Sequence, residues 1–469
     1  MNTSPFHRLI ASAILICLCT CVIAQTDSSV TARRNADSIE DSGHVIAMTD
    51  TLMTDSIEAD TLMTPRWEDT LRERLNALAL EADHSHYYTG ICIYDLTDST
   101  LLYGYNQQKL MRPASNEKTL TAVTALDILG ADHKYSTEVY AVGSLVADST
   151  SCITDSVGGI VADSTVSYTL KGNIYVVGDF DPSLELADIR QMVGAIRNAG
   201  ISTIDGSIIA DVSMKDTLSL GNGWCWDDSQ PYLTPLSLGG SAYTSKPARI
   251  NRYNPSADFV KTLRNELIAD NIGVTGSTGS GVVPRQGNDV VLVTKITHSI
   301  EEILHRMMKN SDNLYAESMF YQLAADKKKG ESWKDCAAEV EAMVHRAAGS
   351  SAHVDVADGC GLSLYNYVSP SVLVAVLRYA YDHKTIFSAL YPSLPVAGVD
   401  GTIASRMTGS KAYANVHAKT GTVTGVSTLA GYVTASNGHF LAFAIMNNGV
   451  KTSAEGRAFQ DKVCAVLAE

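Results

Sequence analysis

The sequence lacks the basic segments that nucleic-acid-binding and peripheral membrane proteins use. It contains no long run of Lys and Arg, and 36 basic residues face 51 acidic ones, giving a formal charge of −15. Because phosphate backbones attract basic patches, this balance argues against a nucleic acid as partner. It also gives no support for attachment to a membrane surface through a polybasic segment. The 469 residues are enough for two or three domains with a large core.

Cysteine and histidine lack the spacing of a metal site. Three of the nine cysteines lie within the first 21 residues, and no C-x-x-C pair occurs. The others are widely spaced, namely Cys92, Cys152, Cys225, Cys336, Cys360 and Cys464. We therefore expect mostly buried free thiols, at most one disulfide of undefined pairing, and no zinc site. His84 and His86 have no evident third ligand nearby, so we expect solvated histidines there.

Long apolar runs are missing except at the start of the chain. Residues 9–24 (LIASAILICLCTCVIA) form an apolar stretch of 16 residues after a weakly basic start, and they end in Val22-Ile23-Ala24. This is the pattern of a secretory signal peptide, and the stretch is short for a membrane span. We predict a signal peptide over 1–24 and export, with an uncleaved anchor as the alternative. Thr20 disfavours lipid attachment at Cys21.

Composition divides the rest of the chain. Residues 25–66 are rich in Asp, Ser and Thr with few large apolar residues, which predicts a disordered tether. Residues 67–133 read as a helix, a hairpin over 87–106 and a further helix. Residues 134–296 alternate strand-like runs with Gly, Asp and Ser turns, with two helical patterns between them, which predicts an inserted α+β domain. Residues 297–469 return to helices, and their last 60 residues read as strand, strand and helix.

The segment MRPASNEKTLTAVTALDILG at 111–130 places a serine and a lysine at the start of a helix. Its apolar face recurs at helical spacing in Leu120, Val123, Leu126 and Leu129. Ser115 and Lys118 are three residues apart and therefore share one side of the helix. A serine hydroxyl needs a base, and a lysine serves as one if burial lowers the pKa of its ammonium. Alone, the pair is better explained by a helix cap followed by a solvated lysine, since Ser-x-x-Lys is common by chance.

Two further motifs follow in order. Ser311-Asp312-Asn313 lies between two helical patterns, and Lys419-Thr420-Gly421 lies on a strand near the C-terminus. Ser-x-x-Lys, Ser-x-Asn and Lys-Thr-Gly in this order are the signature of active-site-serine penicillin-recognising enzymes.

The resemblance extends beyond the motifs. The segments PASNEKTLTAVTAL, KNSDNLYAESM, DGCGLSLYNYVSP, SLPVAGVDGTIASRM and HAKTGTVTGVSTLAGYV resemble the D-alanyl-D-alanine carboxypeptidase/endopeptidase family, the class C low-molecular-mass penicillin-binding proteins of peptidase family S13. An insertion between the first two motifs is typical of that family. The space near 225–255 is too short for the third domain that members often nest there, which puts in doubt the substrate features that such a domain builds.

The resemblance implies a role for each motif residue. Ser115 would form an acyl-enzyme, Lys118 would take its proton with help from the nearby charge of Lys419, and Ser311 would relay a proton to the leaving amine. The substrate would be bound by Asn313, Lys419, Thr420, Gly421 and Thr422. The N–H groups of Ser115 and Thr422 would form the oxyanion hole. No metal or organic cofactor is expected.

Together these features predict an α/β sandwich of the serine β-lactamase/DD-peptidase type, an antiparallel sheet flanked by helices, with an inserted α+β domain. The expected activity is cleavage after D-alanine in peptidoglycan stem peptides, with β-lactam antibiotics as covalent inhibitors. Alternatives are a β-lactamase or esterase on the same scaffold, or a non-catalytic scaffold protein. The expected location is the periplasm, with membrane association through the tether as a variant. Oligomeric state is not defined by the sequence.

Several neighbouring residues favour structural roles. We expect Asp312 to set its loop, Asp358 with 359–361 to form a turn beside the site, and 400–402 to form a turn and helix cap. Trp224 and Trp226 fit either the cleft border or core packing. His417 lies two residues before Lys419 on a strand, and so should face the same side.

Overall fold

The computed structural model describes residues 66–84, 86–148, 153–154, 160–161, 167–225, 228, 230–239, 243–244, 254–287, 289–325 and 332–469. The predicted signal peptide and nearly all of the predicted tether lie outside these ranges. Within them, no helix combines the length and the apolar character needed to cross a membrane.

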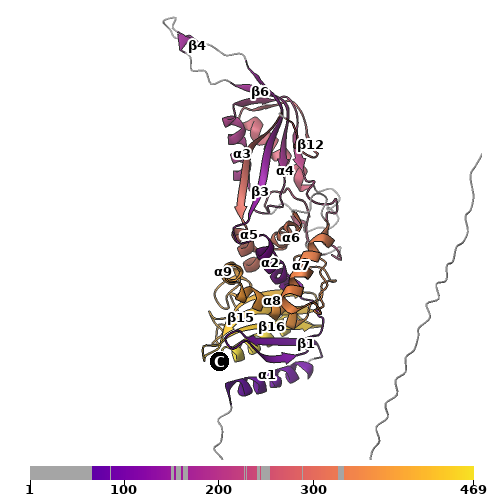
Figure 1. Ribbon diagram of the computed structural model, residues 1–469, viewed down its shortest axis with the longest axis vertical. Coiled ribbons are helices and arrows are strands. Elements are labelled where there is room, and N and C mark those ends of the chain that lie inside the picture. Colours follow the sequence, from indigo (N-terminus) through magenta and orange to yellow (C-terminus); the bar gives the residue numbers. More distant parts are fainter. Residues whose placement is uncertain are drawn as a thin grey trace, which may run out of the picture. The chain divides into compact units, whose positions relative to one another are not determined.

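The first sheet joins the two ends of the described chain. Its five strands follow the order β14-β15-β16-β1-β2, and every pairing is antiparallel. The bounds are β1 Tyr88–Asp95, β2 Thr100–Tyr105, β14 His417–Val423, β15 Val426–Thr434 and β16 Phe440–Asn448. β1 pairs with β16, so indigo and yellow strands lie side by side in Figure 1. The predicted hairpin over 87–106 is confirmed as β1 and β2.

Helices cover both faces of this sheet. On one face α1 packs against β1 and β2, and α10 packs against β15. On the other face α8 packs against β1 and β16, and it contacts α2, α7 and α9. The bounds are α1 Trp67–His84, α2 Glu117–Ile128, α5 Ile300–Asn310, α6 Asn313–Gln322, α7 Trp333–Ala348, α8 Pro370–Asp382, α9 Lys384–Ser393 and α10 Ser453–Leu467. Two separate apolar cores result, one on each face. The predicted antiparallel sheet flanked by helices is confirmed.

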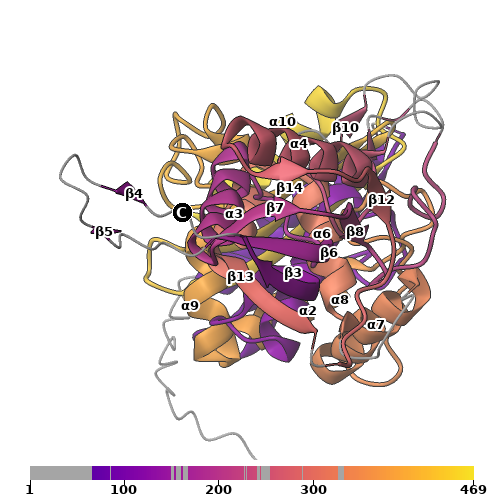
Figure 2. The ribbon, with the colours of Figure 1, turned by 90° about the horizontal axis from the view of Figure 1, so that it is seen from above.

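A second sheet has seven strands. Its main path is β11-β7-β6-β3-β13, with β8 paired to β6 and β12 paired to β8. The bounds are β3 Lys134–Ala147, β6 Tyr168–Val177, β7 Ile201–Ile204, β8 Ile208–Asp211, β11 Gly273–Val274, β12 Thr278–Ser280 and β13 Val290–Ser299. Helices α3 Leu186–Asn198 and α4 Pro255–Ala269 pack on each other and on this sheet (Figure 2). They correspond to the two helical patterns expected within 134–296, and they enclose a third apolar core.

Four short strands complete the described elements, namely β4 Ile153–Thr154, β5 Ile160–Val161, β9 Gln230–Pro231 and β10 Tyr243–Thr244. The sequence-based division of the chain into domains stays a prediction.

One sequence prediction is wrong in detail. Residues 416–436 read as a single strand, but the structure divides them into β14 and β15. The turn at Thr424-Gly425 separates the two strands, and Gly425 has a φ of 76°, a conformation that glycine adopts without steric cost. The alternation of β-formers continues through the turn, which is why the strand pattern alone did not reveal it.

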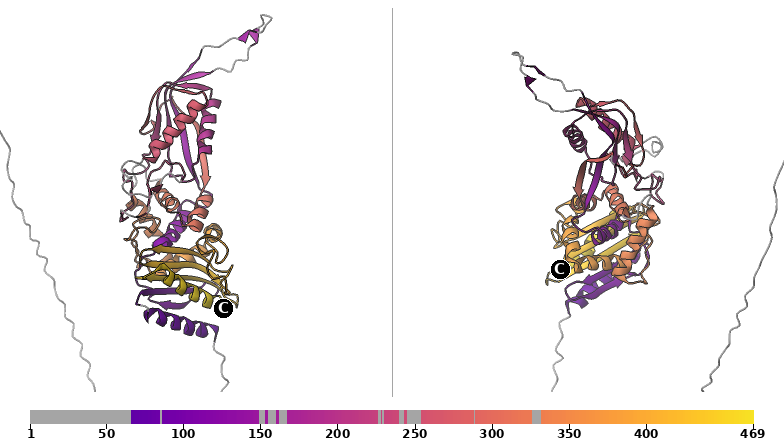
Figure 3. Two further views of the ribbon diagram at one scale, coloured as in Figure 1. Left: turned by 180° about the vertical axis from the view of Figure 1, so that it is seen from behind. Right: turned by 45° about the horizontal axis from the view of Figure 1, so that its top comes forward.

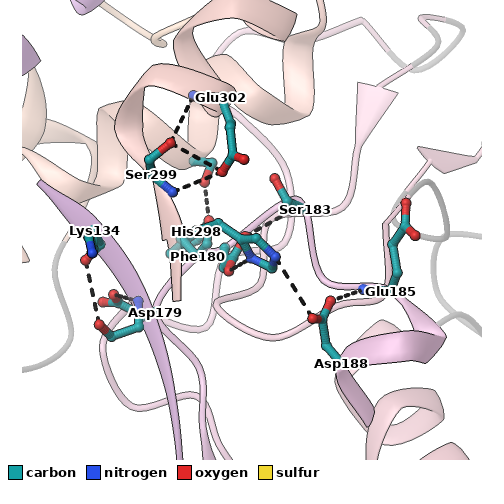
Figure 4. Close-up of polar contacts among 12 residues, drawn as sticks. Lys134, Asp179, Phe180, Ser183, Glu185, Asp188, His298, Ser299 and Glu302 are labelled. Carbon is teal, nitrogen blue, oxygen red and sulfur yellow. Dashed lines mark hydrogen bonds and ion pairs between the residues drawn. The ribbon is translucent and has the colours of Figure 1, made fainter. Parts of the chain in front are cut away.

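A polar junction connects β13 of the second sheet to helix α5. β13 ends at Ser299, and α5 begins at the next residue, with Ser299 and Glu302 forming a reciprocal cap (Figure 4). His298 Nδ1 lies 2.6 Å from the buried carboxylate of Asp181, which also accepts a bond from the Ser183 N–H. Asp188 lies on the other side of the ring, 3.8 Å from Nε2. This junction therefore fixes the start of α5 against the loop after β6. The two views of Figure 3 show helices lying between the two sheets.

The junction predicts a pH-dependent stability. The hydrogen bond to Asp181 raises the pKa of His298, and the charges of Asp181, Asp188 and Glu302 act in the same direction against burial. A raised folded-state pKa means that the stabilisation is complete below the unfolded pKa, about 6.5 for histidine, and is lost as the pH rises through the folded value. We expect His298→Asn to lower the melting temperature at pH 5.5 and to lower it less at pH 9. His353→Asn, at an exposed turn, serves as the control. An equal loss at both pH values would contradict the assignment.

Candidate active site

Ser115 lies in a strained turn at the entrance to a fully buried helix. The 3-10 turn Ala114–Asn116 leads directly into α2, and Ala114 has a φ of 48°, which is rare for a residue with a side chain. The turn is held because the Pro113 carbonyl accepts the Thr428 hydroxyl at 2.7 Å. Every residue of α2 from 117 to 126 is buried, so the predicted apolar face is part of a helix that is enclosed on all sides. Ser115 itself remains half-buried.

Lys118 is fully buried and aimed at Ser115. Its Nζ lies 2.9 Å from Ser115 Oγ, 2.7 Å from Asn313 Oδ1 and 2.8 Å from the Cys360 carbonyl oxygen. A neutral amine has two hydrogens and one lone pair. The carbonyl oxygens of Asn313 and Cys360 can only accept, so they take the two hydrogens. The lone pair then faces the Ser115 hydroxyl, as a general base requires.

Burial is the main reason for the low proton affinity of Lys118. Desolvation lowers the pKa of Lys118, while neighbouring acidic groups, including Asp358 and Glu317, partly oppose this effect. The sequence argument named two causes, burial and the charge of Lys419, and burial is the one that lowers the pKa of Lys118 in the structure. The repulsion between the two lysines is felt by Lys419, whose pKa is lowered well below its ordinary value by burial first and by Lys118 second.

The second and third motifs meet on the other side of the site. Ser311 has a left-handed φ of 57° at the end of α5, and Asp312 caps α6 by accepting the Leu314 N–H. Lys419 Nζ donates to Ser311 Oγ at 2.9 Å, and it also donates to the Thr420 carbonyl at 2.7 Å. Asp312 therefore sets its loop as expected, and the three motifs form one hydrogen-bonded group.

The structure shows why residue 421 must lack a side chain. The sequence analysis placed Gly421 among the residues that bind the substrate. In the structure a Cβ at Gly421 would collide with the Pro113 carbonyl and the Thr428 hydroxyl. The glycine therefore allows β14 to approach the turn that carries Ser115. Thr422, one residue further on, is exposed.

A buried acidic network lies under Lys118. The sequence analysis predicted little of it. Asp358 accepts four hydrogen bonds, from Trp224 Nε1 at 2.7 Å, the Gly361 N–H at 2.7 Å, the Ser363 N–H at 2.6 Å and Asn366 Nδ2 at 2.8 Å. These bonds fix the turn whose Cys360 carbonyl holds Lys118. The expected turn at 358–361 is thus part of the support of the site.

Trp224 bridges between segments rather than only filling space, because its indole N–H reaches Asp358. Glu317 accepts the Gly359 N–H at 3.0 Å, and burial raises its pKa to about 8. The adjacent Glu117 also has a pKa raised well above its ordinary value by burial. Burial therefore favours the neutral form of both acids.

Asp358→Asn is expected to destabilise the protein. The amide would present N–H groups toward donors, leaving buried N–H groups without acceptors, at a cost of about 1–3 kcal/mol for each lost partner. A lower melting temperature in calorimetry would be the readout. Asp355→Asn, at a neighbouring exposed residue that pairs with Tyr367 only through its backbone, is the matched control. An unchanged melting temperature for Asp358→Asn would show that the network has little weight.

The other residues that the sequence analysis singled out lie around the three motifs. Asp400 pairs with Lys309 at 2.7 Å, and the Thr402 and Thr420 hydroxyls are 2.7 Å apart. His417 is half-buried and stacks on Tyr391.

Other predictions from the sequence concern metal ligands and cysteines. His86 is exposed, whereas Trp226 and the His84 side chain lie outside the described part of the chain. The cysteines at 92, 225, 336, 360 and 464 are free thiols, as expected, and Cys152 is not described.

Comparison with known proteins identifies the family of this chain. The sequence model of the D-Ala-D-Ala carboxypeptidase 3 (S13) family matches residues 71–151, 159–238 and 236–469. A D-alanyl-D-alanine carboxypeptidase of Actinomadura sp. (strain R39) is 28% identical, with 85% of this chain and 84% of that protein covered. The D-alanyl-D-alanine carboxypeptidase DacB of Haemophilus influenzae is 24% identical, over 77% of this chain and 86% of that one.

The fold is also similar to a solved structure. The crystal structure of penicillin binding protein 4 (dacB) from Haemophilus influenzae matches with a TM-score of 0.68 at 22% identity, covering 83% of this chain and 97% of that chain. The predicted sandwich of the β-lactamase/DD-peptidase type is confirmed, as is the predicted class of enzyme, a serine-type D-Ala-D-Ala peptidase. The chain belongs to the D-Ala-D-Ala carboxypeptidase 3 (S13) family.

Proposed function

We propose that this peptidase cleaves after D-alanine in peptidoglycan stem peptides through an acyl-enzyme on Ser115. The observation that carries the proposal is the fully buried Lys118 amine, which has two acceptors for its hydrogens and the Ser115 hydroxyl 2.9 Å away.

Acylation uses these groups in sequence. Lys118 takes the proton of Ser115 Oγ while the oxygen attacks the carbonyl carbon of the D-Ala-D-Ala bond. The carbon–nitrogen bond then breaks, and the leaving amine receives the proton from Lys118 through the Ser311 hydroxyl. In deacylation, water adds to the ester carbonyl, the bond to Ser115 Oγ breaks, and the proton returns to that oxygen.

Binding and transition-state stabilisation fall to the surrounding residues. Lys419 and Thr420 bind the terminal carboxylate of the substrate by charge and hydroxyl. Asn313 bonds the substrate backbone while it holds Lys118. The N–H groups of Ser115 and Thr422 receive the oxyanion, and each such donor contributes about 3 kcal/mol by analogy with other hydrolases.

The proposal also covers the cellular location of the enzyme, its domains and its inhibition. We place the protein in the periplasm, exported by a signal peptide over 1–24, with 25–66 as a tether and 134–296 as an inserted domain. β-Lactams act as covalent inhibitors because they present a strained amide to Ser115. The carboxypeptidase and endopeptidase reactions share this acylation, and they differ only in the leaving group.

The proposal is tested by the intact mass of the protein before and after excess benzylpenicillin. We expect a single penicilloyl adduct on the peptide that contains Ser115, together with D-alanine release from acyl-D-Ala-D-Ala substrates. Unmodified protein with hydrolysed penicillin would favour a β-lactamase. Unmodified protein with intact penicillin and no D-alanine release would overturn the proposal.

A further inference from the structure

A cavity lies at the end of the first sheet, next to the turn that carries Ser115. Its volume is about 580 Å³. It forms where the β14–β15 turn, the start of β1, the end of β16 and the segment before Ser115 meet. The lining that matters here consists of Tyr88, Lys109, Arg112, Tyr367, Thr424 and Asn448.

The lining is cationic although the protein is acidic. Lys109 and Arg112 both line the cavity, and no Asp or Glu is among its lining residues, in a chain with a formal charge of −15. Arg112 is oriented by two contacts: its Nε donates to the Leu364 carbonyl at 3.1 Å, and its guanidinium carbon lies 5.8 Å from the centre of the Tyr367 ring. Among the described residues that line the cavity, no carboxylate neutralises either cation.

The cavity wall is held by its own hydrogen bonds. Asn448 Oδ1 accepts the Arg112 N–H at 2.9 Å, and Asn448 Nδ2 donates to the Arg112 carbonyl at 3.2 Å. The backbone of Met111 pairs with that of Val368. Because these contacts fix the Arg112 backbone, the position of its charge is largely set before a ligand arrives, which lowers the entropic cost of binding.

The cavity lies where the upstream residues of a bound substrate would reach. This step rests on the proposed function. β14 is the first strand of its sheet, so a peptide can add to its outer edge as a further strand. A peptide that runs antiparallel to β14, with its terminal carboxylate at Lys419 and Thr420, places its upstream residues toward Thr424. Thr424 lines the cavity, and Arg112 is three residues before Ser115.

We propose that this cavity binds a carboxylate of the stem peptide upstream of the scissile D-Ala-D-Ala bond. The planar guanidinium of Arg112 pairs with the carboxylate, and Lys109 adds charge from the exposed rim. The two tyrosine rings contact the adjoining peptide. The site selects for an acidic upstream residue and against its amide.

The test uses two substrates that differ in one group. L-Ala-γ-D-Glu-L-Lys(acetyl)-D-Ala-D-Ala carries an upstream carboxylate, and its isoglutamine analogue carries a carboxamide in the same place. We expect kcat/KM for D-alanine release to favour the carboxylate by about three- to ten-fold at low ionic strength, and less at high salt, since the pair is partly exposed. In the double variant Lys109→Gln, Arg112→Gln the ratio should fall toward one, whereas Lys384→Gln, which removes an exposed charge on α9, should keep it.

Using a ratio cancels any common effect of the variants on folding or on Ser115. A wild-type ratio of one, or a ratio that survives in the double variant, would overturn the proposal. Calorimetric binding of both peptides to the Ser115→Ala protein gives the same comparison without turnover. If the wild type released no D-alanine from either peptide, the proposed function would fail, while the binding difference would still decide the role of the cavity.

Discussion

The Ser115→Ala protein is expected to lose D-alanine release by roughly 10⁶-fold, the loss seen when a hydrolase is deprived of its nucleophile. No other hydroxyl can replace it easily, because Lys118 is directed at Ser115 by its bonds to Asn313 and the Cys360 carbonyl. The fold should persist, since only one hydrogen bond of a half-buried side chain is removed.

Measurement of this loss needs a matched serine variant. Ser388 lies on the exposed face of α9, and the Ser388→Ala variant should retain the wild-type kcat/KM. Melting temperatures of both variants confirm folding. Full peptidase activity in folded Ser115→Ala protein would assign the nucleophile elsewhere.

Lys118→Met is expected to lower kcat/KM by about 10² to 10⁴-fold, the usual contribution of a general base. Methionine has a similar length, so it fills the buried space without the amine. Because burial lowers the pKa of Lys118, the wild-type kcat/KM should rise with pH through a value below the 10.5 of an ordinary lysine. Below that pKa the amine is protonated and cannot accept the Ser115 proton.

The pH dependence of kcat/KM distinguishes the loss of the general base from damage to the fold. In Lys118→Met the rising limb should disappear, while Lys384→Met, at an exposed position, should retain it. A neutral acyl-D-Ala-D-Ala substrate, whose carboxylate stays ionised over the range, keeps substrate titration out of the profile. If the same rising limb persisted in the methionine variant, another group would be the base.

The sequence predicted those parts of the site that depend on local spacing. Ser115 and Lys118 share a helix face, and the order of the three motifs indicated the enzyme class. The Cys360 carbonyl and Asp358 were not predicted as supports of Lys118, because a contact between residues 242 positions apart leaves no local pattern. Glu317 was missed for the same reason, and its protonation depends on burial that the sequence does not display.

The fold was predicted in a similar way. Long segments with clear periodicity, such as α4 and the β1–β2 hairpin, were placed correctly. The break between β14 and β15 was missed because one glycine interrupts an otherwise continuous strand pattern. The close approach of Pro113 to Gly421 was not predicted because it is a tertiary contact.

The pairing of β1 with β16 has a consequence for how the chain folds as it is made. β1 lies near the start of the described chain and β16 near its end, so Ile91 can pair with Ile445 only after most of the described chain has been made. Until β16 has been synthesised, one edge of β1 and the apolar core beneath it stay open. Such a high contact order slows folding and exposes intermediates to aggregation. The sheet that supports the active site therefore closes only after β16 has been made, and the enzyme stays inactive until then.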